Sequence, residues 1–371
     1  MKPVSASGLK PIILNHFFSP AKSAGVLLDK FGAIQIDPLT IVSKNHLLVF
    51  AARNEKLSGD YINKLYEKRK VVEVFAKERC IVPVSDAYLY ASRLRQNKEH
   101  WWSSRPLKEH PAEVKEVLSL VKTKSEVSPS DFSAKKWNTD HSWRSKNIYT
   151  SILGALHETG ELIISGRNER RLSYSLPPAD LWLAPKKMSD DEIRLKRYER
   201  YLDGVLLTDA RDSFAGFERS GAGERRAMFN RLMETGAAFP VDGVKHFTVV
   251  SKRSLARALR IKETCLPVFI PPLDNSIWNR ELLQKMWSFR YRWEIYTPPA
   301  KREFGPFAMP LVTEDGFFGP VDFKFDRSSG MLIGKMSGSP LKSANRKTKE
   351  AAEVAAQKLA NSIGSAKIAW L

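Results

Sequence analysis

Apolar residues recur at helical spacing through most of the first 105 or so residues. A helix is expected from Ser19 to Gly32, because serine followed by proline favours a helix start and glycine a helix end. Further helices are expected over 38–54, which suits a buried helix, and over 59–70. Residues 34–37 lie between these segments and are predicted to be short and extended.

The pattern changes at about residue 107. A helix, a Ser/Pro-marked turn, a short second helix and a third helix ending at Gly160 are expected in turn. Two short strands follow over 161–165 and 172–176, joined by the polar turn "GRNERR". This order of helices and a terminal hairpin is typical of a winged helix, whose hairpin or third helix commonly contacts the DNA backbone.

A similar order recurs over about 188–262. Both segments contain a helix, Thr-Gly and an apolar strand, written "HETGELII" in the first and "METGAAFP" in the second, which indicates a weak structural repeat. The remainder, about 263–371, alternates apolar residues with turns at "EDGF" and "RSSG", as in a β-meander or small barrel. An Ala-rich helix is expected to close the chain.

The chain of 371 residues is too long for one compact core, and two to four domains are expected. Lys and Arg number 60 against 41 Asp and Glu, giving a net charge of +19. This excess attracts polyanions, with nucleic acid first and an anionic membrane surface second. The charge is spread along the chain, with no polybasic block beside a long apolar amphipathic stretch. Nucleic acid is therefore the expected partner.

Cysteine and histidine usage argues against disulfides and metals. The only cysteines, Cys80 and Cys265, are far apart and form no CxxC, so a disulfide framework is excluded and a Cys-ligated zinc is not expected. The seven histidines form no HExxH motif. No segment resembles a signal peptide or approaches the roughly 20 apolar residues of a membrane helix. We expect a soluble, intracellular protein without a metal or cofactor.

The run Gln35-Ile36-Asp37 precedes Pro38, and a proline disfavours helical geometry in the residue before it. If the run is extended, Gln35 and Asp37 project from one face and could hold a water molecule between an amide and a carboxylate. The alternative is that Asp37 caps a helix starting at Pro38, using the amides of the next two residues. Spacing alone favours the cap.

Other candidates also have two interpretations. Arg167, Arg170 and Arg171 in the hairpin turn are either solvated charges or phosphate contacts; the net charge and the winged-helix order favour contacts. Lys245 and Arg253, around the strand and basic helix of the third segment, are expected to bind DNA in the same way. The pair Trp101-Trp102 could stack on bases but more often packs a domain junction. His46 is either near the site or a core histidine.

Taken together, these stretches resemble the winged-helix family that includes the AlkZ and YcaQ-type bacterial DNA glycosylases. The resemblance extends in order along nearly the whole chain, and its combination of motifs is specific. The segments that carry it are residues 32–37 with His46, 72–84, 142–167, 272–312 and 316–327. The family pattern has aromatic–Ala–His–Glu where this chain has Phe75-Ala76-Lys77-Glu78, and no role is carried over to Lys77.

The resemblance implies an α+β fold of tandem winged-helix domains with a small C-terminal β-rich domain. We expect an N-terminal winged-helix-like catalytic domain at 1–106, further winged helices at 107–187 and 188–262, and the β-rich domain with its terminal helix at 263–371. It also implies a monofunctional glycosylase, a monomer without a cofactor, acting in the cytoplasm at the nucleoid. The substrate would be double-stranded DNA carrying alkylated or crosslinked purines.

Gln35-Ile36-Asp37 corresponds to the family's catalytic motif in its carboxylate form, which is similar to the YcaQ branch that removes N7-alkylated guanines and unhooks their crosslinks. An N7-alkylguanine is cationic and leaves as a neutral base, so Asp37 would stabilise the charge developing on the sugar while Gln35 holds the water. A winged-helix regulator, or a paralogue that binds damaged DNA without cutting it, remains the alternative.

Overall fold

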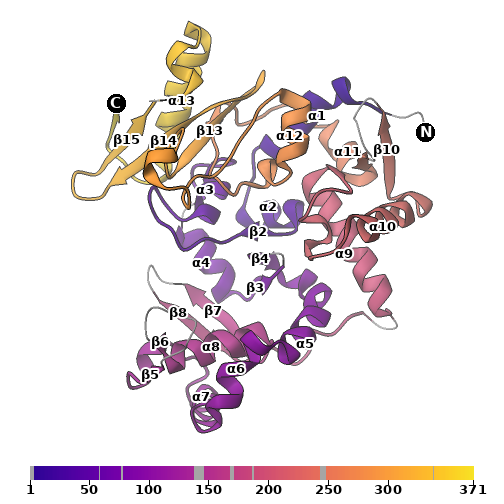
Figure 1. Cartoon of the computed structure of the whole chain (residues 1–371), viewed down its shortest axis with the longest axis vertical. Helices are drawn as coiled ribbons and strands as arrows, with labels where there is room; N and C mark the ends of the chain where they lie inside the picture. The colour runs from indigo at the N-terminus through magenta and orange to yellow at the C-terminus, as the bar shows by residue number, and fades with distance from the viewer. Residues whose placement is uncertain are drawn as a thin grey trace. The chain divides into compact units, whose positions relative to one another are not determined.

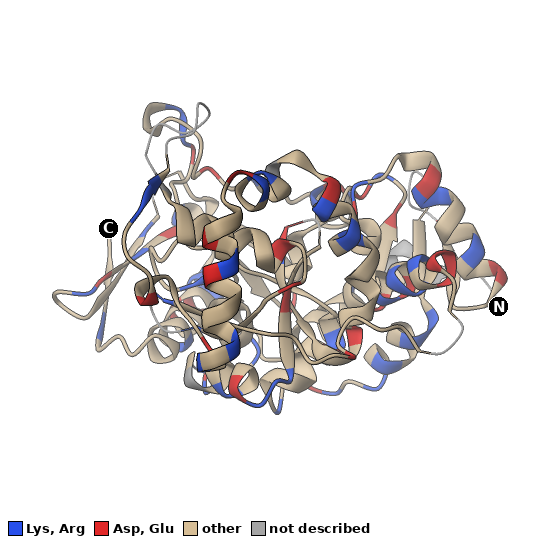
Figure 2. Ribbon diagram, turned by 90° about the horizontal axis from the view of Figure 1, so that it is seen from below, with Lys and Arg blue, Asp and Glu red and all other residues tan. Residues whose placement is uncertain are grey.

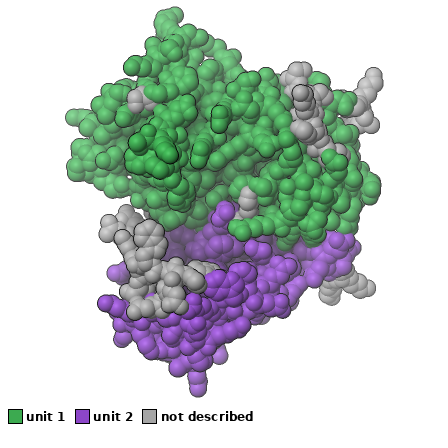
Figure 3. Space-filling model, viewed as in Figure 1, with its two compact units in different colours: residues 1–61, 194–371 green, residues 62–193 purple. Residues whose placement is uncertain are grey.

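The computed structural model divides the chain into two compact units. The first unit consists of residues 1–61 and 194–371, and the second of residues 62–193 (Figure 3). The four domains expected from the sequence are a finer division, which these units do not test. The residues that the structure describes are 4–57, 59–76, 78–137, 146–167, 171–185, 188–242, 248–336 and 338–371.

The C-terminal part of the first unit is a five-stranded sheet covered by one long helix, α13 (Figure 1). Its central strands form the meander expected from the sequence, with turns at the two predicted sites, and the predicted Ala-rich helix is α13. The edge strands β12 and β16 were not expected. The elements are β12 (Val268–Phe269), β13 (Ala308–Thr313), β14 (Gly316–Asp326), β15 (Met331–Lys335), α13 (Arg346–Ser362) and β16 (Lys367–Trp370).

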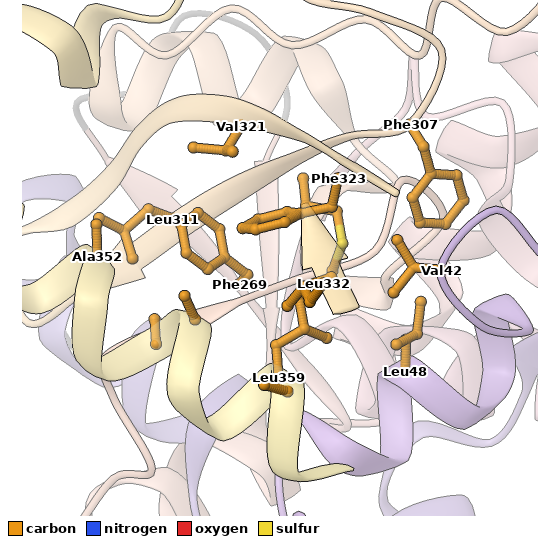
Figure 4. Packing of buried hydrophobic residues seen from close by; sticks show 14 of the residues in the cluster. Val42, Leu48, Phe269, Phe307, Leu311, Val321, Phe323, Leu332, Ala352 and Leu359 are labelled. Atoms are coloured by element: carbon orange, nitrogen blue, oxygen red, sulfur yellow. The ribbon is translucent and has the colours of Figure 1, made fainter. Parts of the chain in front are cut away.

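The core beneath this sheet includes residues from the N-terminal end of the chain. Phe269 and Phe323 meet edge to face at 4.8 Å, and Leu359 of α13 packs into the same cluster (Figure 4). Val42 and Leu48, which follow the Gln35-Ile36-Asp37 run, are buried in it as well. Burying these apolar side chains together joins the two ends of the chain in one hydrophobic core.

The rest of the first unit is mainly helical and carries a four-stranded sheet in the order β1-β10-β11-β9. Its strands are β1 (Val4–Ser5), β9 (Leu207–Asp209), β10 (Ala238–Asp242) and β11 (Thr248–Ser251). Its helices are α1 (Ala6–Phe18), α2 (Ala24–Phe31), α3 (Asn45–Ala51), α10 (Ala222–Glu234), α11 (Lys252–Ala258) and α12 (Arg280–Trp287); a short strand, β2 (Ile34–Gln35), follows α2. Helices α4 (Gly59–Glu67) and α9 (Asp190–Val205) carry the chain from one unit into the other.

The second unit has the helix and hairpin order of a winged helix, as expected. Its hairpin β7–β8 is antiparallel, and the preceding helices are those predicted, with a 3-10 turn (Pro129–Asp131) as the short second one. A second hairpin pairs β3 with β4. The elements are β3 (Val71–Phe75), β4 (Arg79–Pro83), α5 (Ala91–Glu99), α6 (Trp101–Glu109), α7 (Pro111–Lys124), β5 (Lys136–Trp137), β6 (Lys146–Asn147), α8 (Ile148–Glu158), β7 (Ile163–Arg167) and β8 (Leu172–Ser175).

The predicted repeat is present as a shared helix ending. In both copies a threonine is the C-cap residue, and its hydroxyl donates to a carbonyl in the last helical turn. Thr159 donates to the Leu156 carbonyl at 3.2 Å, and Thr235 donates to the Leu232 carbonyl at 3.1 Å. The following glycine, Gly160 or Gly236, has a φ of 79° or 71°, the left-handed geometry that reverses the chain into a strand. The Thr-Gly pair therefore encodes the same turn twice.

Two helix predictions need correction. The helix expected from Ser19 begins at Ala24, capped by Ser23, whose hydroxyl accepts the Val26 amide at 3.3 Å. The helix expected over 38–54 is limited to Asn45–Ala51, because residues 38–44 are held by the C-terminal sheet: the Phe325 amide donates to the Ile41 carbonyl at 3.0 Å. Among the described residues, no helix has both the length and the apolarity to cross a membrane.

Candidate active site

The Gln35-Ile36-Asp37 run begins where α2 ends. Gly32 has a φ of 77°, which lets the chain turn out of the helix into β2. Two asparagine side chains hold the backbone here: the Asn275 amide donates to the Ala33 carbonyl at 2.8 Å, and the Asn45 amide donates to the Gln35 carbonyl at 3.0 Å. The run is therefore anchored to α3 and to the segment after β12.

These anchors depend on a buried ion pair between Arg53 and Asp274, whose side chains are fully buried. The pair is bidentate, and Arg53 also donates from Nε to the Phe17 carbonyl at 2.9 Å. Asp274 in turn accepts the Ser276 amide at 2.9 Å. Because the charges are matched and hydrogen-bonded, the pair holds α1, α3 and the 272–276 segment together without an uncompensated buried charge.

Asp37 lies in an Asx turn and not at the start of a helix. Its Oδ1 accepts the Leu39 amide at 2.8 Å, whereas α3 begins only at Asn45. Burial raises the pKa of the Asp37 carboxyl, and the hydrogen bond from the Leu39 amide works in the opposite direction. Within the described part of the chain nothing donates to Oδ2, so half of the carboxylate is left for a substrate or water. The expected helix start at Pro38 is therefore wrong, whereas the hydrogen bond expected from the Leu39 amide is present.

Gln35 lines a pocket of about 390 Å³ in the first unit. Its side chain is 9% exposed, and the buried Oε1 accepts no hydrogen bond from any residue that the structure describes. A buried acceptor in this state is costly unless water or a ligand satisfies it. Asp37 is not part of the pocket lining. The other lining residues are Arg211, Asp212, Ser213, Phe214, Pro272, Leu273, Ile277, Trp278, Asn279, Arg280 and Glu281.

The pocket has an aromatic wall. Trp278 stacks on Phe214 with ring centroids 5.5 Å apart and an interplanar angle of 15°. The indole N–H is used in a hydrogen bond of 3.0 Å to the Leu273 carbonyl, which fixes the ring in place. Phe214 is partly exposed and Trp278 is 8% exposed. The wall offers a flat, rigid apolar surface.

The charges around the pocket are largely compensated. Arg211 pairs with Glu281 at 2.8 Å. Asp212 is buried, which raises its pKa, and it accepts hydrogen bonds from the Tyr201 hydroxyl and from the Thr208 hydroxyl at 2.6 Å. Its oxygens are occupied in this way, so Asp212 is a poor candidate for proton transfer to a ligand.

His46 and Trp101 can both be placed in the structure. His46 lies in α3 and is 2% exposed, which favours its interpretation as a core histidine. Trp101 has 53% of its surface exposed, and the side chain of Trp102 lies outside the described part of the structure, so the packing of this pair at a domain junction stays a prediction. Within the described ranges, no group of three or more His, Cys, Asp or Glu is arranged to hold a metal ion.

Arg167 is not the exposed phosphate contact expected from the sequence. Its guanidinium forms a bidentate ion pair with Glu73, whose side chain is fully buried, and only 13% of the Arg167 side chain is exposed. The Tyr66 hydroxyl donates to the same carboxylate at 2.8 Å. Burial alone would raise the pKa of Glu73, but the hydrogen bonds and charge of Arg167 lower it. Arg167 therefore neutralises a buried carboxylate.

The other predicted DNA contacts fall into two groups. Arg171 is exposed after the hairpin turn, and Arg253 is 74% exposed, with its nearest carboxylate, Asp203, at 3.5 Å. Both remain accessible to a phosphate. Arg170 and Lys245 lie outside the described residues.

Sequence reasoning assigned no role to the four polar residues that hold the site, namely Asn45, Arg53, Asp274 and Asn275. A signal was present, because Asp274-Asn275 lies in one of the segments that carry the family resemblance. Arg53 and Asp274 are 221 residues apart and Asn275 is 242 residues from Ala33, and neither spacing nor periodicity reports such pairs.

A family model described as "DNA glycosylase AlkZ-like" matches residues 28–361. Among solved structures, DNA glycosylase AlkZ of Streptomyces sahachiroi is similar, with 14% sequence identity and a TM-score of 0.62, over 99% of this chain and 100% of that one. At this identity the similarity shows a shared fold. The expected α+β fold with winged helices and a small C-terminal β-rich domain is thus confirmed.

The buried ion pair generates a stability prediction. Asp274→Asn removes the charge that neutralises Arg53 while keeping the side-chain shape, so we expect the free energy of unfolding to fall by about 3–5 kcal/mol. Urea denaturation of the purified protein measures this change. Adding Arg53→Met to Asp274→Asn should recover part of the loss, because no unpaired buried charge remains.

The matched control is Lys196→Gln, which breaks the exposed Lys196–Glu199 pair in the first unit. Exposed pairs contribute about 0–1 kcal/mol, so this variant should unfold near the native midpoint. An effect of Asp274→Asn no larger than that of the control would contradict the structural role given to the buried pair.

Proposed function

The chain belongs to the AlkZ-like DNA glycosylase family, and we propose that it is a repair enzyme that hydrolyses the N-glycosidic bond of N7-alkylated purines, including those in interstrand crosslinks. It acts on double-stranded DNA as a monomeric, monofunctional glycosylase, in the cytoplasm with the chromosome. The carboxylate form of its motif, Gln35-Ile36-Asp37, supports a reaction of the YcaQ type. The observation that carries the proposal is the geometry of this run: a carboxylate oxygen and an amide oxygen to which no described residue donates, on one short anchored segment.

The chemistry of a cationic leaving group fits these two side chains. An N7-alkylated purine departs as a neutral base, so the reaction needs no general acid; the difficulty is the positive charge that develops on the deoxyribose. Asp37 in its ionised form stabilises this charge through Oδ2, while the Leu39 amide keeps Oδ1 in place. Gln35 uses its free Oε1 to accept a hydrogen bond from the attacking water.

The pocket beside Gln35 is proposed to receive the damaged base. Its volume of about 390 Å³ lies in the range of small-molecule sites. The Trp278–Phe214 wall supplies a π face, which attracts a flat cationic ring and releases the neutral base more readily once the bond has broken. The aromatic wall thus favours the charged form of the base over the product.

The basic composition supports binding to the DNA backbone. Lys and Arg are distributed over the described ribbon (Figure 2) and occur in the residue ranges of both units, and the net charge is +19. Contacts of this kind set affinity and its salt dependence but carry no base sequence. Arg171 and Arg253 are the two predicted contacts that the structure leaves exposed.

Asp37→Asn is the decisive substitution. We expect release of N7-methylguanine from alkylated duplex DNA to fall by about a hundredfold or more, because the neutral amide cannot stabilise the sugar cation. DNA binding should be retained, since the substitution removes one negative charge but no phosphate contact. Chromatography of the released base and a binding titration measure the two quantities.

The matched control is Asp315→Asn, an exposed carboxylate in the C-terminal sheet that pairs with Lys347. It should release base at the native rate. Native protein that releases no cationic purine adduct would establish the alternative, a winged-helix binder without catalysis. If Asp37→Asn releases the damaged base as fast as the native protein, Asp37 has no catalytic role.

The pH dependence follows from the same carboxylate. Because Asp37 must be ionised and burial raises its pKa above the ordinary value of 3.8, enzymatic release should fall as the pH is lowered through this raised pKa and level off above it. Single-turnover rates from about pH 4 to 8, after subtraction of the Asp37→Asn rate, report the acid limb. If the rate instead falls only at or below pH 3.8, the ordinary pKa of the carboxyl, this would contradict the role of a buried, ionised Asp37.

Substitutions of the two hairpin arginines, Arg167 and Arg171, should have different effects on stability and on DNA binding. Arg171→Ala is expected to weaken binding to any duplex and to lower the slope of log K against log salt by about one unit. Arg167→Met leaves Glu73 buried and unpaired, so it should destabilise the protein by about 3–5 kcal/mol without lowering that slope. The test is to measure the salt dependence of DNA binding and the thermal unfolding of both variants. An unchanged slope for Arg171→Ala would mean that Arg171 does not contact a phosphate.

A further inference from the structure

A second pocket, of about 690 Å³, lies in the first unit between α2, the segment before it, and α11 with the residues after it. It shares no lining residue with the pocket beside Gln35. Two carboxylates, those of Asp29 and Glu263, belong to its lining. Six of the lining side chains are basic: Lys22, Lys30, Arg253, Arg257, Arg260 and Lys262.

Lys30 is the most unusual of these cations because it is 8% exposed and has no carboxylate partner among the described residues. Its Nζ donates one hydrogen bond, of 2.7 Å, to the Ser19 hydroxyl, and an ammonium has three donors. Burial lowers the pKa of Lys30, and the positive charges of Arg53 and Arg257 lower it further. Burial and the neighbouring positive charges disfavour the charged form of Lys30, and an anion bound beside it would favour that form.

Arg257 of α11, which also lines this pocket, has an unused hydrogen-bond donor as well. Its Nη2 donates to the Ser254 hydroxyl at 3.1 Å, while its buried Nε has no hydrogen-bond partner in the described ranges. Burial lowers the pKa of Arg257 as well. Two buried or half-buried cations with unused donors therefore line one pocket. Elsewhere in this unit the buried Arg53 is neutralised by Asp274.

The burial of Lys30 limits which anions can reach it. A group must enter the pocket to reach the buried Lys30, and an internal phosphodiester could do so only if the nucleotides on both sides entered with it. A terminal phosphate enters alone, carries close to two negative charges at neutral pH and offers three acceptor oxygens. Val26, Leu27 and Ile261 in the lining supply apolar surface for the organic body behind it.

We propose that this pocket binds the terminal phosphate of a phosphomonoester, with Lys30 and Arg257 as its principal ligands. The chemistry is the same whether the phosphate belongs to a free mononucleotide or to the phosphorylated 5′ end of a DNA strand. The exposed basic residues at the rim, such as Arg260 and Lys262, attract the ligand, and the buried pair holds the phosphate. This site does not depend on the proposed glycosylase reaction.

Calorimetric titration of the full chain with 5′-deoxyguanosine monophosphate, inorganic phosphate and deoxyguanosine tests the proposal. The nucleotide should bind, and the nucleoside, which lacks the phosphate, should bind at least about tenfold more weakly. Lys30→Met and Arg257→Gln should each weaken nucleotide binding about tenfold or more, since each removes charge-assisted hydrogen bonds. Lys349→Met, which removes an exposed lysine on α13, should bind as the native protein does.

Short single strands with and without a 5′-phosphate separate the two sources. If the 5′-phosphate raises the affinity of a strand and Lys30→Met abolishes this increase, the proposal is supported with the phosphorylated strand end as the ligand. If the nucleotide binds but the 5′-phosphate does not raise strand affinity, the proposal is supported with a free nucleotide as the ligand. Equal affinity for the nucleotide and the nucleoside would overturn the proposal. Unchanged nucleotide affinity in Arg257→Gln would also overturn it, and this variant decides the outcome if Lys30→Met does not fold. The readout is binding and not base release, so either result leaves the glycosylase tests intact.

Discussion

The candidate active site depends on one buried charge pair, Arg53 with Asp274. The Gln35-Ile36-Asp37 run is too short to hold its own conformation, since β2 is only two residues long. The Gln35 carbonyl is fixed by Asn45, in the helix whose Val49 carbonyl accepts a hydrogen bond from Arg53. The Ala33 carbonyl, just before the run, is fixed by Asn275, the residue after Asp274. Because both charges are buried and hydrogen-bonded, loss of one partner would free the segment that carries the reacting groups.

The same segment is fixed on its other side by the C-terminal sheet. The Thr40 carbonyl accepts a hydrogen bond of 2.8 Å from Arg327, the Ile41 carbonyl accepts one from Phe325, and Val42 is buried in the core of the sheet. Asp37 therefore lies between an anchor supplied by residues 274–275 and another supplied by residues 325–327. This explains why the first 61 residues and the last part of the chain belong to one compact unit.

Buried charge has three different outcomes in this protein. Arg53 and Arg167 each pair with a carboxylate that is itself fully buried, so both arginines stabilise the fold. Lys30 and Arg257 remain without such a partner in the described residues, which is why their pocket is interpreted as a ligand site. Asp37 is intermediate: one oxygen is occupied and the other is open. The same residue types therefore have structural or chemical roles according to whether the fold supplies the opposite charge.

The sequence alone determined the strands of the C-terminal meander, the winged-helix hairpin, the Thr-Gly helix endings and the short strand that ends at Gln35, because periodicity and turn residues act over a few positions. Only the tertiary structure decided that residues 38–44 are not helical, that Arg167 is buried against Glu73, and that Asn45 and Asn275 hold the site. Most of these outcomes follow from contacts between residues far apart in the chain, such as Arg167 with Glu73 and Asn275 with Ala33. Local patterns carry no information about which distant side chain will supply a hydrogen bond or a charge.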